Sequence, residues 1–343
     1  MTEAVIAFLA ASLLFYVLFG GADFGAGILE LFLDESTRRE KQRLISKAMA
    51  PVWEANHVWL VLAVVIVFMG FPTVYTTITT ALHIPVMALL IGIVGRGCAF
   101  TFRHYDAGPT DYSRVYSKVF MVSSLWSSFF IGIIAGACSL GRIENDASTF
   151  YAAYIVPWAN PFCFFMGLFC CALFAMLAAV YLIGEAKDPD TKSVFRLYAL
   201  RANIALIITG PLLFMSAELD NLPLVTLFFG NSWCLFCFTA ATILLVPLWI
   251  SLRRSGSPLI SRILAASIVT LVLFGWYALQ YPLAIRFNES ARTDGISFFT
   301  AAAPEATMRA LLAALVAGSL LIFPALAYLF KVFKWETLNE VGD

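Results

Sequence analysis

Pro51-Val-Trp-Glu-Ala-Asn-His-Val-Trp-Leu-Val-Leu-Ala-Val-Val-Ile-Val-Phe-Met-Gly-Phe71 is the stretch that decides the class of fold. Its second half is uncharged and apolar, so Glu54, Asn56 and His57 lie in the first turns of a segment that enters a membrane. Glu54 and His57 are three residues apart and share one helical face. An ionisable pair placed there needs polar partners or a task, such as proton relay or ligand binding. The alternative is the interfacial end of an ordinary helix, where both side chains stay hydrated and tryptophans anchor it.

The whole composition is that of a polytopic α-helical membrane protein. Of 343 residues, 61% are hydrophobic and 13% are charged, too few charges to cover a soluble surface. Apolar stretches of about 20 residues recur, and nothing alternates with the period of two that a membrane β-barrel requires. The formal net charge is zero, so nucleic acid is not expected as a partner. The first segment is too long, and at Asp23 too polar, for a cleaved signal peptide.

The seven cysteines lie almost entirely in apolar runs, which is typical of small core residues rather than disulfides. Cys234 and Cys237 form a Cys-x-x-Cys motif, but it falls inside an expected membrane helix and has no second pair. We therefore expect no metal site.

Hydropathy predicts about nine membrane spans. They run approximately over residues 4–33, 51–71, 75–101, 115–141, 158–184, 200–219, 223–252, 258–283 and 302–332. The odd-numbered loops and the C-terminal tail are basic, whereas the even-numbered connections are short, acidic or mixed. By the positive-inside rule the basic loops are cytoplasmic, which places the N-terminus outside and the C-terminus in the cytoplasm. The spacing of the basic loops suggests four spans, then four more, then one.

Four ionisable residues are expected in the cytoplasmic half of three consecutive spans. At 1.5 Å per helical residue, Asp23 lies about 15 Å from the end of its span and Arg96 about 9 Å, while Glu54 and His57 lie about 5–10 Å in. Glycines around Asp23 would let neighbouring helices approach closely. The arrangement is that of a buried polar pocket or a proton path. The alternative is a set of unrelated charges that reach back to the membrane surface.

The three histidines do not form an obvious haem site. A bis-histidine haem needs its two ligands at one level, whereas His57 and His83 are expected about 20 Å apart in depth and His104 lies in a loop. A haem with a single histidine ligand stays open at this point.

Two motifs resemble subunit II of the cytochrome bd-type quinol oxidases. They are Gly21-Ala-Asp-Phe-Gly-Ala-Gly-Ile-Leu29 and the stretch from Pro51 to Leu60. Matches continue in order through the chain at Phe71–Tyr75, Arg96 with Phe100 and Arg103, Phe174–Leu182, Tyr281–Pro282 and Ala302–Thr307. The Glu-Ala-Asn-His version of the second motif is similar to the cyanide-insensitive branch of that family.

The resemblance implies a haem-free subunit of a heterodimer in the bacterial cytoplasmic (inner) membrane. The implied fold is a four-helix bundle over residues 1–142, a second over 150–284, and a ninth peripheral helix with a cytoplasmic tail over 300–343. Haems b and d and the quinol-oxidation site would belong to subunit I. Small single-span subunits are further partners that the resemblance allows.

The resemblance also implies roles for individual residues. Glu54 stands where the family has a carboxylate that lines a proton pathway from the cytoplasm, and we expect Asp23 and His57 to assist it. In some members the positions of Trp53, Asp23 and Arg96 border a structural quinone. The expected function is therefore the non-haem subunit of an electrogenic quinol:oxygen oxidoreductase.

Two other classes of protein are compatible with the same polar residues. A secondary transporter would use them as a substrate site, and then interrupted helices in matching positions are expected. A structural scaffold would use them only to hold helices together.

Overall fold

The computed structural model describes residues 1–35, 37–105, 111–143, 148–220, 222, 224–254, 256–287 and 295–339; in the helices, the side chains of residues 54–55, 104–105, 111–113, 326–327 and 329–339 lie outside the described part. Within these ranges nine helical segments are long and apolar enough to cross a membrane. The chain is an all-α polytopic membrane protein, as the hydropathy predicts.

The first span is continuous but not uniform. It consists of α1 (Thr2–Phe15), a π-helical turn η1 (Tyr16–Gly20) and α2 (Gly21–Glu30). The other elements are, in chain order, α3 (Arg38–Gly70), α4 (Pro72–Ala81), α5 (His83–Tyr105), α6 (Asp111–Leu140), α7 (Phe150–Tyr154), α8 (Pro161–Glu185), α9 (Pro189–Leu219), α10 (Leu224–Phe229), α11 (Ser232–Arg253), α12 (Pro258–Gln280), β1 (Leu283–Arg286), β2 (Gly295–Ser297) and α13 (Glu305–Asn339).

Polar caps followed by proline set the start of several spans. The Asn160 side chain accepts a hydrogen bond from the Cys163 amide at 2.9 Å, and the Asp188 side chain does the same for the Thr191 amide at 2.9 Å. Each cap is followed by a proline in the first turn, where the missing N–H costs nothing. The local sequence therefore defines where α8 and α9 begin.

Several of the expected spans have different boundaries in the structure, and the sixth, expected over 200–219, begins at Pro189. The second begins not near residue 51 but at Arg38, so most of the expected loop 34–47 is helical. The expected span 75–101 is two helices that meet at Leu82. The cause is Pro85, whose ring clashes with the carbonyl of the residue four positions earlier and so ends α4 at Ala81.

The expected span 223–252 is likewise interrupted, because Asn231 caps a new helix. Its side chain accepts from the amides of Trp233 and Cys234 at 3.1 Å, which starts α11 and leaves α10 as a separate short helix. After α12 the chain forms a two-stranded antiparallel hairpin of β1 and β2 that the sequence did not indicate. Strands of four and three residues are too short to produce a visible alternation.

Helix α8 lies at the centre of the molecule. In its most apolar window 67% of the residues are buried, against 17% in α13. Helix α2 crosses it closely, and glycines on α2 make this approach possible. A Cβ on Gly25 would meet the Phe174 carbonyl oxygen, and one on Gly21 would lie 2.8 Å from the Phe174 ring. Helix α8 also packs on α6, α9 and α12, so one core cluster joins the two expected bundles. The bundle boundaries themselves stay a prediction.

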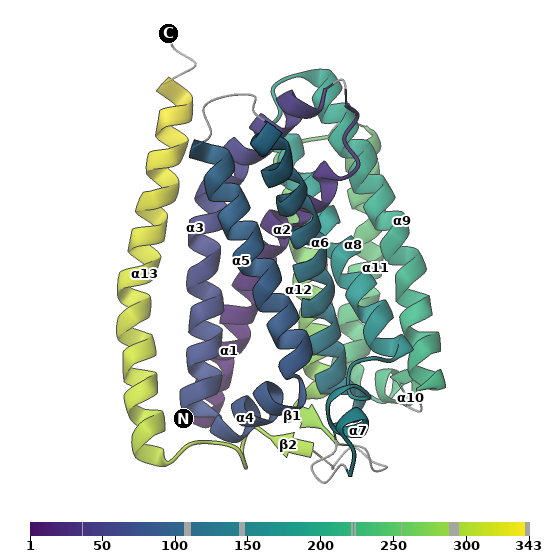
Figure 1. Ribbon diagram of the computed structural model, residues 1–343, viewed down its shortest axis with the longest axis vertical. Helices are drawn as coiled ribbons and strands as arrows, with labels where there is room; N and C mark the ends of the chain where they lie inside the picture. Colours follow the sequence, from purple (N-terminus) through teal and green to yellow (C-terminus); the bar gives the residue numbers. More distant parts are fainter. Residues whose placement is uncertain are drawn as a thin grey trace.

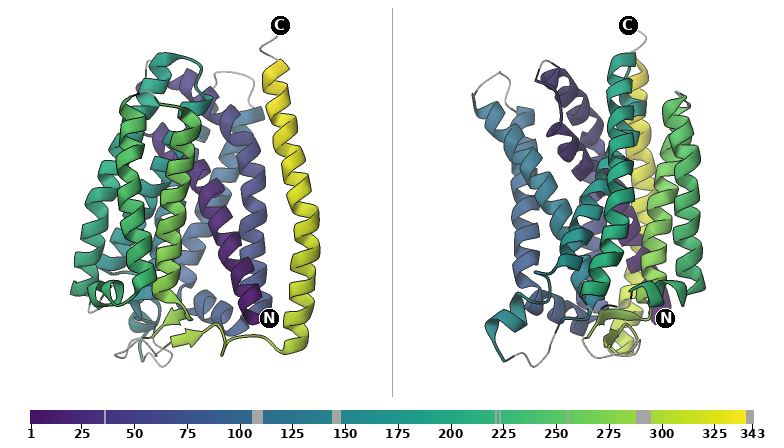
Figure 2. Two further views of the ribbon diagram at one scale, coloured as in Figure 1. Left: turned by 180° about the vertical axis from the view of Figure 1, so that it is seen from behind. Right: turned by 90° about the vertical axis from the view of Figure 1, so that its right-hand side faces the viewer.

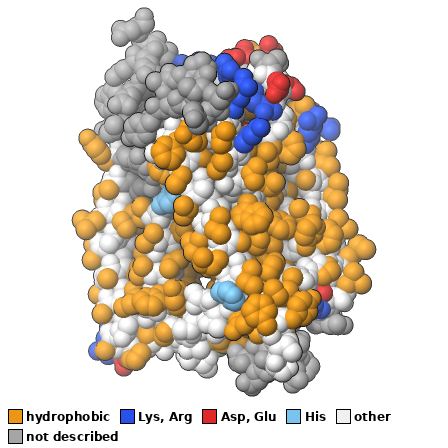
Figure 3. Space-filling view, viewed as in Figure 1, with side chains coloured by type: hydrophobic (Ala, Val, Ile, Leu, Met, Phe, Trp, Pro, Cys, Tyr) orange, Lys and Arg blue, Asp and Glu red, His pale blue; other side chains and the backbone are white. Residues whose placement is uncertain are grey.

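Helix α13 stands at the edge of the molecule and packs on α1 and α3 (Figures 1 and 2). The first residue of the chain lies at the end with the hairpin, and α13 runs from that end to the other (Figure 1). Lys and Arg side chains gather at the far end (Figure 3), which we call the basic end and where α3 begins with Arg38 and Arg39 and Lys187 precedes α9. The polar site lies towards this end, between α2, α3 and α5.

Candidate functional site

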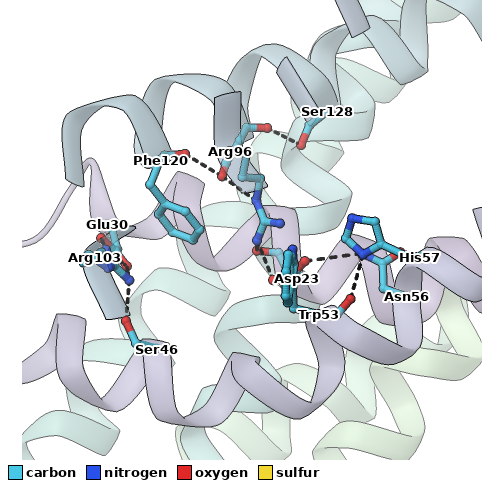
Figure 4. A network of polar contacts seen from close by, with 11 residues as sticks. Asp23, Glu30, Ser46, Trp53, Asn56, His57, Arg96, Arg103, Phe120 and Ser128 are labelled. Carbon is cyan, nitrogen blue, oxygen red and sulfur yellow. Dashed lines mark hydrogen bonds and ion pairs between the residues drawn. The ribbon is translucent and has the colours of Figure 1, made fainter. Parts of the chain in front are cut away.

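Asp23 of α2 and Arg96 of α5 form a buried ion pair (Figure 4). Their side chains are 0% and 2% exposed. The Arg96 Nη2 atom donates to the Asp23 carboxylate and, at 3.0 Å, to the backbone carbonyl oxygen of Asp23. The Arg96 Nε atom donates to the hydroxyl of Ser124 on α6 at 3.0 Å. The prediction that Asp23 and Arg96 lie at one depth is confirmed, and the reason is that each neutralises the other.

Helix α3 contributes an amide to this pair. Asn56 Nδ2 donates to the second carboxylate oxygen of Asp23 at 3.3 Å, and the Asn56 side chain is 2% exposed. A Cβ on Gly20 would lie 2.7 Å from Asn56 Oδ1, so the glycine is what lets α3 approach the first span here. Sequence reasoning noted Asn56 but gave it no role. Asn56 lies between Glu54 and His57 in the sequence but on a different helical face from both, and this position was the indication that it contacts another helix.

His57 does not join the ion pair. Its Nδ1 atom lies 2.8 Å from the backbone carbonyl oxygen of Trp53, on its own helix, and its ring meets the Trp53 ring edge-on at 5.2 Å. Glu54 belongs to α3, but its side chain lies outside the described part. Of the four ionisable residues expected to meet, the structure thus brings Asp23 and Arg96 into contact and leaves His57 on a separate face.

A second buried ion pair lies next to the first and was missed. The Glu30 carboxylate, 0% exposed, accepts from Arg103 Nη1 at 2.8 Å and from Arg103 Nη2 at 3.1 Å. Gln42 donates to the same carboxylate at 3.0 Å, and Arg103 also donates to the Ser46 hydroxyl. The signal was present in the sequence, because Glu30 follows Asp23 by seven residues and Arg103 follows Arg96 by seven.

The equal spacing explains how the two pairs form together. Seven residues are two helical turns, about 10 Å, so two acids on α2 face two arginines on α5 in register. The Phe120 ring of α6 lies between the arginines, with its centroid 4.9 Å from the Arg96 guanidinium carbon and 4.6 Å from that of Arg103. Contact with an aromatic face stabilises a buried guanidinium. A shift of either helix by one turn would leave a charge unpaired.

Trp53 lies beside the ion pairs and is half-buried. Its ring packs on Phe100 of α5 at 5.4 Å between centroids. Its Nε1 atom is buried and has no hydrogen-bond partner among the described groups. Trp53 therefore carries a hydrogen-bond donor without a described partner next to the aromatic ring of Phe100. Asp23 and Arg96 lie deeper and contact each other.

Comparison with known proteins identifies the family. A family model described as cytochrome bd terminal oxidase subunit II matches residues 1–333. The chain belongs to this family.

Relatives of this bd-family chain are similar over part of their length. Cytochrome bd ubiquinol oxidase subunit 2 of Bacillus subtilis (strain 168) is 28% identical over 179 residues, which are 50% of this chain and 51% of that protein. Cytochrome bd-I ubiquinol oxidase subunit 2 of Escherichia coli (strain K12) is 23% identical over 165 residues, 47% of this chain and 43% of that protein. The aligned part thus spans about half the length of the curated relatives.

The fold is similar along the whole chain. A structure of the bd oxidase from Geobacillus thermodenitrificans matches with a TM-score of 0.74, covering 97% of this chain and 98% of that one at 21% identity. At this identity the match speaks for the fold alone. In this chain the fold carries the two ion pairs described above on the first and third spans.

The cysteines of this bd-family chain are free thiols, Cys234 and Cys237 included. Among the described residues no three His, Cys, Asp or Glu side chains are grouped so that they could hold a metal ion. Further ion pairs join Arg142 to Asp220 at 3.0 Å and Arg262 to Glu185 at 2.7 Å, but among the described pairs those between α2 and α5 are the most deeply buried.

Proposed function

We propose that this chain is subunit II of a terminal oxidase that converts quinol and O2 into quinone and water. The observation that carries the proposal is the family match over residues 1–333. The buried acid–base pairs support it, because charges are kept at this depth in a membrane where they hold helices in register or move protons. The family match also favours this function over that of a secondary transporter.

The proposal includes a haem-bearing partner, subunit I, with haems b and d. These haems supply electron transfer and O2 reduction when bound. The two histidines whose side chains the structure describes do not suit a bis-histidine haem in this chain. His57 is within α3 and His83 begins α5 near the hairpin end, which separates them by about 20 Å along the helices. This chain would then stabilise its partner and serve its proton supply.

The proton route that we propose begins at Glu54. Reduction of one O2 to two waters takes up four electrons and four protons, and two quinols supply the electrons. A glutamate in the first membrane turns of α3 can change charge state and rotate, which suits it to pass protons inwards. Asp23 is held by Arg96 and Asn56, so it would provide a fixed negative charge beside that route, and His57 would assist from the neighbouring face.

A structural quinone is part of the proposal at Trp53. The free Nε1 of Trp53 would donate to a quinone carbonyl, and Phe100 would contact the ring. Asp23 and Arg96 would border this site from behind rather than bind the quinone directly.

The test combines purification with one substitution. Extraction in mild detergent through a tag on this chain should yield a larger membrane partner in equal amount, with b- and d-type haem signals in the dithionite-reduced-minus-oxidised spectrum. Glu54→Gln should then lower quinol oxidase turnover at least about tenfold at unchanged haem content, because the amide cannot carry a proton.

Glu3→Gln is the matched control, because Glu3 is an exposed acid at the start of the first span, whereas Glu54 lies on α3. It should leave turnover unchanged. Normal turnover in Glu54→Gln would reject the proton route. A colourless protein that repeatedly purifies alone would reject the oxidase function and return the transporter to consideration.

A further inference from the structure

Tyr16 places a buried hydroxyl next to the ion pair. The side chain is 6% exposed, and its hydroxyl has no hydrogen-bond partner among the described protein groups. The ring packs edge-on against Phe24, with centroids 6.4 Å apart, and the Arg96 guanidinium lies over the Phe24 face at 4.8 Å. Tyr16 is also within electrostatic reach of Asp23 and Arg96. The hydroxyl therefore belongs to the polar site and not to the lipid-facing surface.

Asn56 leaves a second atom without a partner at the same place. Its Nδ2 atom donates to Asp23, whereas its Oδ1 atom is buried and accepts no hydrogen bond from a described group. That oxygen faces Gly20, the last residue of η1, while Tyr16 is the first. Both atoms thus border the π-helical turn, and such turns inside α-helices are frequent at functional sites because they shift side chains and backbone groups out of α-helical register.

The three groups have complementary hydrogen-bonding needs. A tyrosine hydroxyl can donate, the Asn56 oxygen can accept, and the Asp23 carboxylate can accept beyond its bonds to Arg96 and Asn56. Internal water in proteins makes two to four hydrogen bonds, roughly three on average, to buried groups that lack a protein partner. We propose that ordered water binds between η1 and α3, held by the Tyr16 hydroxyl, Asn56 Oδ1 and the Asp23 carboxylate.

This site gives Tyr16 a positioning role. Tyr16 precedes Asp23 by seven residues, about two helical turns, so the water would lie on the side of the ion pair that faces the middle of the membrane. The role as a continuation of the proton route rests on the proposed function. The water site itself does not, since it follows from the unpartnered Tyr16 hydroxyl and Asn56 oxygen beside the Asp23 carboxylate.

Hydroxyl-radical labelling by X-ray radiolysis tests the site without turnover. Radicals form from water at the point of irradiation, so a buried ring is labelled only where water lies beside it. The chain is irradiated in mild detergent together with the partner chains that accompany it, and labelled peptides are quantified by mass spectrometry. Tyr16 should be labelled severalfold more than Phe71, a ring that is 0% exposed and packs against Phe298.

Tyr16→Phe is the decisive variant because its ring stays reactive but can no longer hold water. The label at position 16 should fall to the level of Phe71. A native Tyr16 no more labelled than Phe71 would show that the site is dry and overturn the proposal. An undiminished label in Tyr16→Phe would overturn it too, because water would then reach the ring without the hydroxyl. Either result leaves the Glu54→Gln test of oxidase function unaffected.

Discussion

At the scale of single residues, the two ion pairs between α2 and α5 differ in how completely they are satisfied. Glu30 receives hydrogen bonds from Arg103 and Gln42 on both carboxylate oxygens. Asp23 receives them from Arg96 and Asn56 and lies beside the unpartnered Tyr16 and Asn56 atoms. A saturated pair is suited to hold helices, whereas a pair with unpartnered polar atoms beside it is suited to hold water. We therefore interpret Glu30–Arg103 as structural and Asp23–Arg96 as part of the functional site.

This assignment predicts that Glu30→Gln destabilises the fold. Arg103, whose side chain is 10% exposed, would keep a charge without its carboxylate partner. Breaking a buried pair on one side costs about 3–5 kcal/mol. The apparent midpoint of thermal unfolding in detergent should fall clearly below that of the native chain.

Glu305→Gln is the matched control for this effect. It breaks an ion pair with Arg309 whose side chains are 69% and 71% exposed, and such pairs contribute about 0–1 kcal/mol. The midpoint should barely move. Equal midpoints for Glu30→Gln and Glu305→Gln would contradict the structural role of Glu30.

At the scale of elements, the close crossing of α2 and α8 depends on glycine. Gly25→Ala would drive a methyl group into the Phe174 carbonyl oxygen and to 2.9 Å from the Ala178 Cβ, and neither is the end of a flexible side chain. Overpacking of this kind costs about 1–3 kcal/mol. We expect Gly25→Ala to lower thermal stability and the yield of folded protein in the membrane.

Gly318→Ala on α13 provides the comparison, because a Cβ there would meet nothing within 4 Å. Alanine stabilises an open helical position relative to glycine by about 0.5–1 kcal/mol. Thermal unfolding and fluorescence-detected size exclusion of the two variants measure the difference. A Gly25→Ala variant as stable as Gly318→Ala would mean that α2 and α8 are less closely packed than described.

At the scale of the whole molecule, an odd number of spans among the described residues places the two ends of the chain on opposite faces. The basic end carries Arg38, Arg39 and Lys187 and, by the positive-inside rule, should lie in the cytoplasm. We predict that Thr300→Cys reacts with a membrane-impermeant maleimide in intact cells and that Lys187→Cys reacts only after the membrane is opened. Both positions are exposed and lie at opposite ends of the molecule. The reverse pattern of labelling would overturn the predicted orientation.

The sequence by itself determined the number of membrane spans, the family and the approximate depth of the buried charges. The length and hydropathy of the apolar runs predicted a nine-span helical membrane protein, because backbone groups in lipid must be hydrogen-bonded within the segment. The motifs around Asp23 and Pro51 were sufficient to indicate the family that the match over residues 1–333 confirms. Depth, which follows from residue count along a helix, placed Asp23 and Arg96 together correctly.

Only the tertiary structure decided which side chains meet, because depth says nothing of the direction in which a helix faces. In the structure Asn56 donates a hydrogen bond to Asp23, the His57 ring contacts the backbone of its own helix, and Glu30 forms an ion pair with Arg103. The π-helical turn and the hairpin after α12 also depend on contacts between segments far apart in the chain, such as Asn56 against Gly20. Hydropathy averages over a window and cannot register such contacts, so the sequence indicated only some of the site's residues, such as Asp23 and Arg96, and packing decided the rest and the geometry.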